Sequence, residues 1–99
     1  MERYEVINCL AEALTEITGK NIYGTVSSIK DTRFPVYVNH TITLGSDETE
    51  WGLESQKMVN SKEVDKDTAF RQLLVQLLTH LLRTAVDGKL PVQELELKF

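Results

Sequence analysis

Two side chains in this sequence have the chemistry of a catalyst or a metal ligand, the imidazole of His40 and the thiol of Cys9. His40 stands in a stretch where apolar and polar residues alternate, a place that would suit a proton-transfer group. A cysteine nucleophile needs a neighbouring base or cation, and none stands near Cys9 along the chain. Because neither residue has a partner at ligand spacing, we predict no catalytic centre. A small enzyme with a pocket around His40 is kept as the second alternative function.

An acidic stretch could in principle surround a divalent cation, and its members are Asp47, Glu48, Glu50 and Glu54. It lacks the alternating oxygen ligands and the central glycine of an EF-hand loop. The sequence also contains no P-loop, dinucleotide-binding, nucleophile-elbow or zinc-protease motif. We therefore expect a protein that is not an enzyme and that uses no cofactor and no metal.

The elements that position these residues are expected to form a single domain over residues 1–99. The chain is 41% hydrophobic and 26% charged, as globular domains are, and its formal net charge is -4. A negative net charge disfavours non-specific attraction to nucleic acid and to anionic lipid. One cysteine cannot form an intramolecular disulfide, and no run of residues has the apolar length of a signal-peptide core or a membrane span. We expect a cytoplasmic protein that contacts no membrane.

The first half of the chain predicts one helix followed by strands. The helix covers residues 2–18, ends at Gly19, and carries its apolar stripe at helical spacing on Val6, Ile7, Leu10, Ala13, Leu14 and Ile17. Residues 22–29 are rich in β-formers and predict a strand in which Gly24 marks a bulge or a close approach. After a turn at residues 30–33, the strict alternation of residues 34–44 is the clearest strand signal.

The following segment gives a weaker signal. Residues 45–50 predict a loop, and residues 51–59 predict an uncertain strand. Its uncertainty comes from Ser55 and Lys57, which share the parity of the apolar positions. The element order α-β-β-(β)-α-β predicts an α+β fold, with a small antiparallel or mixed sheet of three to four strands packed against two helices.

The second helix is predicted over residues 65–87 and carries the one anomaly of the sequence. Leucine pairs repeat every four residues along it, as Leu73, Leu74, Leu77, Leu78, Leu81 and Leu82. Together with the other apolar residues of this segment they cover well over half of the helix circumference. One face of a sheet cannot bury so wide an arc. The helix is predicted to end at residues 87–88, and residues 92–99 predict a final strand with one face exposed to solvent.

The wide apolar arc favours a small non-catalytic protein that binds protein or takes part in assembly. We predict that its contact residues are Leu74, Val75, Leu78 and Leu82. The arc can pack against the same helix of a second chain, as two-fold symmetric oligomers do, or it can lie between the sheet and the first helix of one chain. A phage or prophage accessory protein, an inhibitor or an adaptor would fit such a chain.

The sequence also resembles two known families. The order α-β-β-β-α resembles the double-stranded RNA-binding domain, on the residues Ser61, Lys62, Lys66 and Ala69 at the start of the second helix. That resemblance implies contact of Lys62 and Lys66 with duplex RNA, which is the first alternative function, although Glu63 and Asp65 interrupt the basic cluster. The succession of helix, hairpin containing residues 34–38, helix and final strand is also similar to small phage tail-completion and tail-terminator proteins, which assemble as rings.

Overall fold

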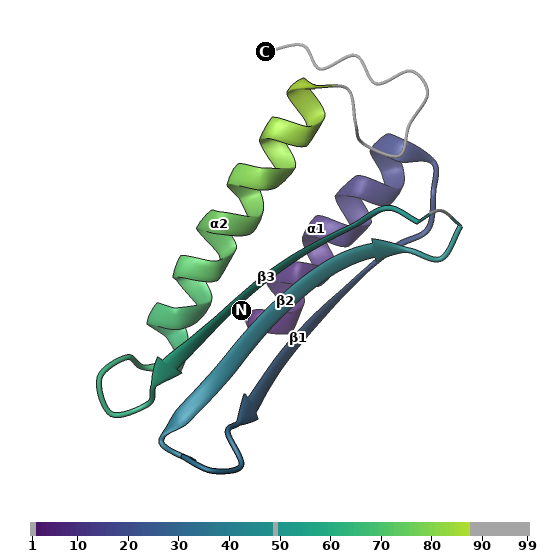
Figure 1. Cartoon of the computed structure of the whole chain (residues 1–99). Coiled ribbons are helices and arrows are strands. Elements are labelled where there is room, and N and C mark those ends of the chain that lie inside the picture. Colours follow the sequence, from purple (N-terminus) through teal and green to yellow (C-terminus); the bar gives the residue numbers. More distant parts are fainter. Residues whose placement is uncertain (1, 49, 88–99) are drawn as a thin grey trace.

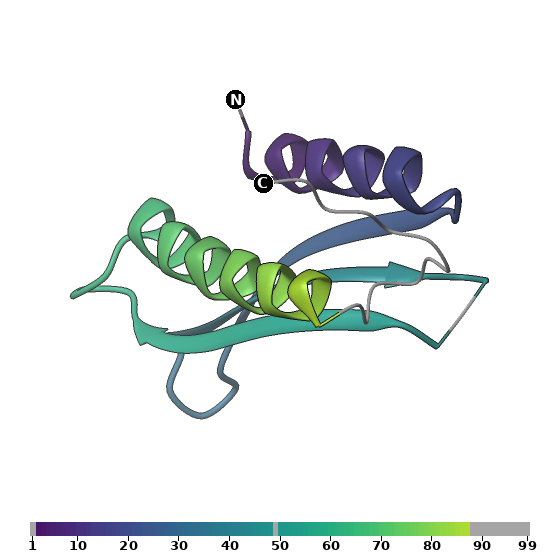
Figure 2. The same cartoon turned by 90° about the horizontal axis from the view of Figure 1, so that it is seen from above.

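The computed structural model describes residues 2–48 and 50–87, which form two helices and one antiparallel sheet. In chain order the elements are α1 (Arg3–Thr18), β1 (Ile22–Lys30), β2 (Tyr37–Ser46), β3 (Gly52–Asn60) and α2 (Lys66–Val86) (Figure 1). The strand order is β1-β2-β3, and both helices cover the same face of the sheet, α1 over β1 and α2 over β3 (Figure 2). The predicted α+β class is confirmed. The expected closing strand over residues 92–99 lies outside the described residues.

Helix α1 ends where its glycine predicts. Gly19 has a φ of 69°, and its N–H donates to the carbonyl oxygen of Thr15 at 2.9 Å. The predicted stripe is only partly correct, because the buried residues are Ile7, Ala11 and Leu14, whereas Ile17 is 52% exposed. The helix is rotated so that the small side chain of Ala11, rather than a larger one, faces the sheet.

Gly24 allows α1 to approach β1 closely. The pairing of β1 with β2 runs without interruption through Gly24 and Leu44, so the predicted bulge is wrong and the close approach is confirmed. A Cβ atom on Gly24 would overlap the Cγ2 atom of Ile7 and lie 3.2 Å from the Ile7 carbonyl oxygen. The absence of a side chain at this position therefore fixes the height of α1 above the sheet.

Strand β2 begins later than the alternation predicts. The Asp31 side chain accepts the N–H groups of Arg33 and Phe34 at 2.8 and 2.9 Å, and Tyr37 donates its N–H to the Phe34 carbonyl at 2.9 Å. These bonds close a turn in which the backbone cannot also pair with β1. Phe34 was predicted to belong to this strand. It lies instead in the turn, where it is 62% exposed.

The weakly predicted third strand is confirmed, and its polar residues have partners on α2. Ser55 is 2% exposed, and its hydroxyl donates to Oε1 of Gln76 at 3.0 Å. The Nζ atom of Lys57 donates to Oε1 of Gln72 at 2.8 Å. One flank of α2 therefore supplies acceptors for the polar residues on the inner face of β3, which is why this strand lacks a simple apolar alternation.

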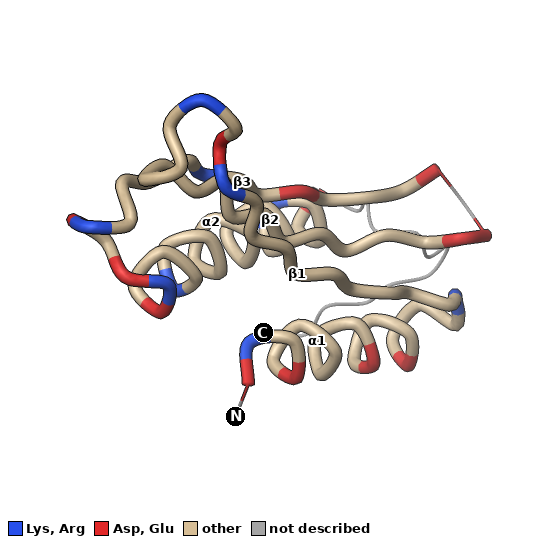
Figure 3. The backbone as a smooth tube through the Cα atoms, turned by 90° about the horizontal axis from the view of Figure 1, so that it is seen from below, with Lys and Arg blue, Asp and Glu red and all other residues tan. Residues whose placement is uncertain are grey.

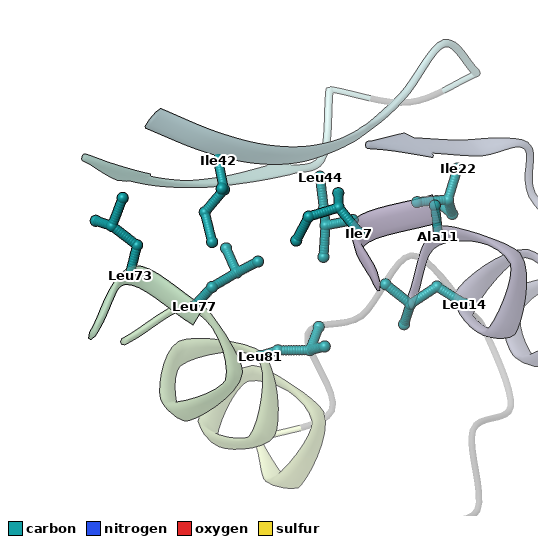
Figure 4. Close-up of a cluster of buried hydrophobic side chains, with 9 residues drawn as sticks. All are labelled: Ile7, Ala11, Leu14, Ile22, Ile42, Leu44, Leu73, Leu77 and Leu81. Atoms are coloured by element: carbon teal, nitrogen blue, oxygen red, sulfur yellow. The ribbon is translucent and has the colours of Figure 1, made fainter. Parts of the chain in front are cut away.

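The core lies between the sheet and the two helices (Figure 4). Its buried side chains come from both helices and from β1 and β2, and they are Ile7, Ala11, Leu14, Ile22, Ile42, Leu44, Leu73, Leu77 and Leu81. Burying each leucine contributes about 1.5–3 kcal/mol relative to exposure. Among the described residues, every buried side-chain nitrogen or oxygen atom has a hydrogen-bond partner, so the core contains no uncompensated polar group there.

Candidate functional site

Helix α2 carries the residues that the sequence assigned to partner binding, and its start is fixed by a side-chain cap. Asp65 has extended backbone angles (φ -75°, ψ 166°), and its Oδ1 accepts the N–H of Thr68 at 2.7 Å. The Thr68 bonds hold the pKa of the Asp65 carboxyl below its ordinary value.

One leucine of each pair on α2 points toward the sheet and is buried. The buried residues of this helix repeat every four positions and are Ala69, Leu73, Leu77 and Leu81. Leu74 and Leu78, two of the predicted contact residues, are half-buried beside this stripe and pack against the core cluster. The structure therefore places these two at the margin of the core.

The other two predicted contact residues are exposed. Val75 is 57% and Leu82 is 54% exposed. Leu82 lies five positions after the buried Leu77. At 100° per residue, its side chain therefore points about 140° around the helix from that of Leu77. The sequence alone indicates a wide arc, and the structure shows that this part of the arc points away from the sheet.

Val86 extends this exposed surface, although it was not among the predicted contact residues. It is 69% exposed and follows Leu82 by four positions, one helical turn. We call Val75, Leu82 and Val86 the outer face of α2. Beside its C-terminal end lies an open hollow of about 420 Å³, lined by Leu82, Arg83, Val86 and Asp87. The same four-residue spacing that revealed the leucines would have identified Val86.

His40 lies on the inner face of the sheet and is 5% exposed. A hydrogen bond of 2.7 Å joins its Nδ1 to the hydroxyl oxygen of Ser28 on the neighbouring strand. Burial lowers the pKa of His40 below its ordinary value of 6.5, and the positive charges of Arg3 and Lys66 lower it further. The environment therefore favours a neutral imidazole.

The space around His40 is small, about 10 Å³. The described residues that line it include no carboxylate and no thiol; they are Arg3, Val26, Ser27, Ser28, His40, Thr41, Ile42, Phe70 and Leu73. Cys9 is exposed on α1. Within residues 2–48 and 50–87, no group of three or more His, Cys, Asp or Glu side chains could hold a metal ion. The described chain thus does not join His40 to the partners that the enzyme alternative requires.

The residues of the RNA alternative lie at the end of the sheet where two turns meet. Lys62 and Lys66 are exposed, and the neighbouring Ser61 N–H donates to the Val36 carbonyl at 2.8 Å, which ties the β3–α2 connection to the β1–β2 turn. Both connections carry basic and acidic residues close together, Arg33 near Asp31 and Lys62 beside Glu63, whereas the β2–β3 turn at the opposite end carries acidic residues (Figure 3). The end of the sheet where the two connections meet therefore carries charges of both signs.

The sheet face that no described helix covers also exposes apolar side chains. Ile29 is 65%, Met58 is 52% and Tyr37 is 40% exposed. Strand pairing aligns Ile29, Asn39 and Met58 across the three strands. The sequence analysis did not single out these positions.

Comparison with known proteins does not assign the chain to a class. No protein-family model matches the sequence, and the searches of curated proteins and of solved structures found no similar protein. None of the helices among the described residues is both long enough and apolar enough to span a membrane.

Proposed function

We propose that this protein is a small, non-catalytic binding or assembly protein of the cytoplasm, which contacts a protein partner through the outer face of α2. One observation carries the proposal. Val75, Leu82 and Val86 are each more than half exposed on a helix whose neighbouring stripe is already buried in the core. A phage or prophage accessory, inhibitor or adaptor role fits a chain that exposes such a surface.

The energy available from this face is modest for a single copy. Covering the exposed half of three aliphatic side chains gives about 1 kcal/mol each, from about 1.5–3 kcal/mol for complete burial. Association costs an estimated 4–15 kcal/mol in lost motion, so three residues on one side do not suffice. The half-buried Leu74 and Leu78 add to the buried apolar area. In a two-fold symmetric dimer the same residues are buried on both copies, so the free energy of burial doubles.

Solution mass tests whether the partner is a second copy of this chain. We expect light scattering to show a mass that rises with protein concentration, and Leu82→Glu to abolish the rise because a carboxylate cannot be buried there without a partner. His80→Glu is the matched control, since it adds a carboxylate at an exposed position of the same helix outside the outer face. A mass that stays at that of one chain for the unmodified protein and both variants would refute self-association through this face.

A second candidate function is duplex RNA binding, favoured by the meeting of two turns that each expose a basic residue, Arg33 and Lys62, at one end of the α-β-β-β-α fold. Lys62 and Lys66 would contact phosphates, so binding would weaken steeply with salt. The joint variant Lys62→Glu and Lys66→Glu should abolish it, while Lys20→Glu, at the end of α1, should not. Failure of the protein to shift duplex RNA at low salt would exclude this function.

A further inference from the structure

We propose that the partner of the outer face is α2 of a second copy, and that the two helices pack antiparallel with Leu78 and Thr79 beside the two-fold axis. This inference depends on the proposed function and specifies its partner and geometry. It follows from the spacing of the exposed residues, from the charges at the two ends of the helix and from the free space around it.

The spacing makes the surface complementary to itself. Val75 and Leu82 lie seven residues apart, almost two complete turns, with Leu78 between them. When two such helices run in opposite directions about a point between Leu78 and Thr79, Val75 of each copy faces Leu82 of the other. An exposed valine and an exposed leucine then cover each other twice, once on each side of the axis.

The charge of Arg71 disfavours a parallel pair of helices. Arg71 is exposed and lies eleven residues before Leu82, three turns along the same side of the helix. In a parallel pair, the guanidinium groups of both copies would meet across the contact and repel. In the antiparallel pair, Arg71 faces Val86 of the second copy near the negative end of that helix, where the charges of Asp87 and Arg83 offset each other.

The surroundings leave room for a second helix. Helix α1 packs on β1, while α2 packs on β3 at the other edge of the sheet, so no described helix covers the outer face (Figure 2). From Arg71 to Val86 the contact is about 22 Å long at 1.5 Å per residue. This length allows four turns of each helix to meet.

Disulfide formation between single cysteines tests the direction, in a background with Cys9→Ser. We expect a mixture of the Val75→Cys and Leu82→Cys proteins to form a cross-linked heterodimer under mild oxidation. We expect Val86→Cys alone not to cross-link, because its two copies would stand about 22 Å apart, far beyond the reach of a disulfide. The substituted residues are exposed, so each variant should fold.

The outcomes separate this inference from the function on which it depends. Efficient cross-linking of Val86→Cys with itself would indicate parallel helices, and a concentration-dependent mass without any of these cross-links would place the interface elsewhere. Either result overturns the antiparallel pair and leaves binding through some surface intact. A mass of one chain at every concentration would overturn both the pair and self-association.

Discussion

Replacing Leu77 or Leu82 of α2 by alanine, one at a time, compares how much the buried stripe and the outer face contribute to the free energy of unfolding. Leu77 is fully buried, whereas Leu82 is 54% exposed. Leu77→Ala removes a buried side chain and leaves a cavity, which costs about 2.7–5 kcal/mol. Leu82→Ala removes a side chain that solvent already reaches on one half, so we expect about 1 kcal/mol within one copy.

Urea unfolding at two protein concentrations measures both effects. With a denaturant slope of roughly 1 kcal/mol per molar, Leu77→Ala should lower the midpoint by roughly 3 M and Leu82→Ala by roughly 1 M in dilute protein. A hundredfold increase in concentration should stabilise a dimer of the unmodified chain by about 2.7 kcal/mol. Leu82→Ala should show a smaller increase because its interface is weaker.

Two results would refute this reasoning. If Leu82→Ala costs as much as Leu77→Ala in dilute protein, Leu82 is enclosed within a single copy, and the outer face does not exist as a free surface. If the midpoint of the unmodified protein is the same at both concentrations, folding is not linked to association. Circular dichroism of each variant before denaturation provides the control for a folded starting state.

Three further predictions concern positions away from the outer face. Gly24→Ala should cost about 1–3 kcal/mol in urea unfolding, because the new methyl group would overlap Ile7; an unchanged midpoint would mean that α1 can move away freely. Burial lowers the pKa of His40 below 6.5, so the unfolded chain binds this proton more readily, and stability should fall as pH drops below about 6.5 until the folded imidazole is also protonated. That loss should be absent in His40→Gln, and an identical pH profile of the two proteins would contradict the assignment. Asp65→Ala should lower the midpoint at neutral pH and remove a part of the acid sensitivity, since the cap to Thr68 is strongest when the carboxyl is ionised; Asp67→Ala is the control without a cap.

Local sequence rules predicted the elements well where a residue acts through its own backbone. Gly19 ended α1 in the left-handed conformation, because this effect needs only the nearest turn of chain. The start of α2 was predicted at residue 65, and the structure shows that Asp65 is its cap. The same rules failed at Phe34. Alternation extended the strand through it, whereas the carboxylate of Asp31 captured two backbone N–H groups and made a turn.

The sequence by itself determined that α2 has more apolar circumference than a sheet can cover, since the four-residue repeat fixes which side chains share a side of the helix. Only the tertiary structure decided that Leu77 faces the core while Leu82 faces solvent. It also decided that Ser55 donates a hydrogen bond to Gln76, and that His40 is buried and hydrogen-bonded to Ser28. These outcomes depend on contacts between residues twelve or more positions apart, and such contacts follow from how the helices and strands pack rather than from the period of any one of them.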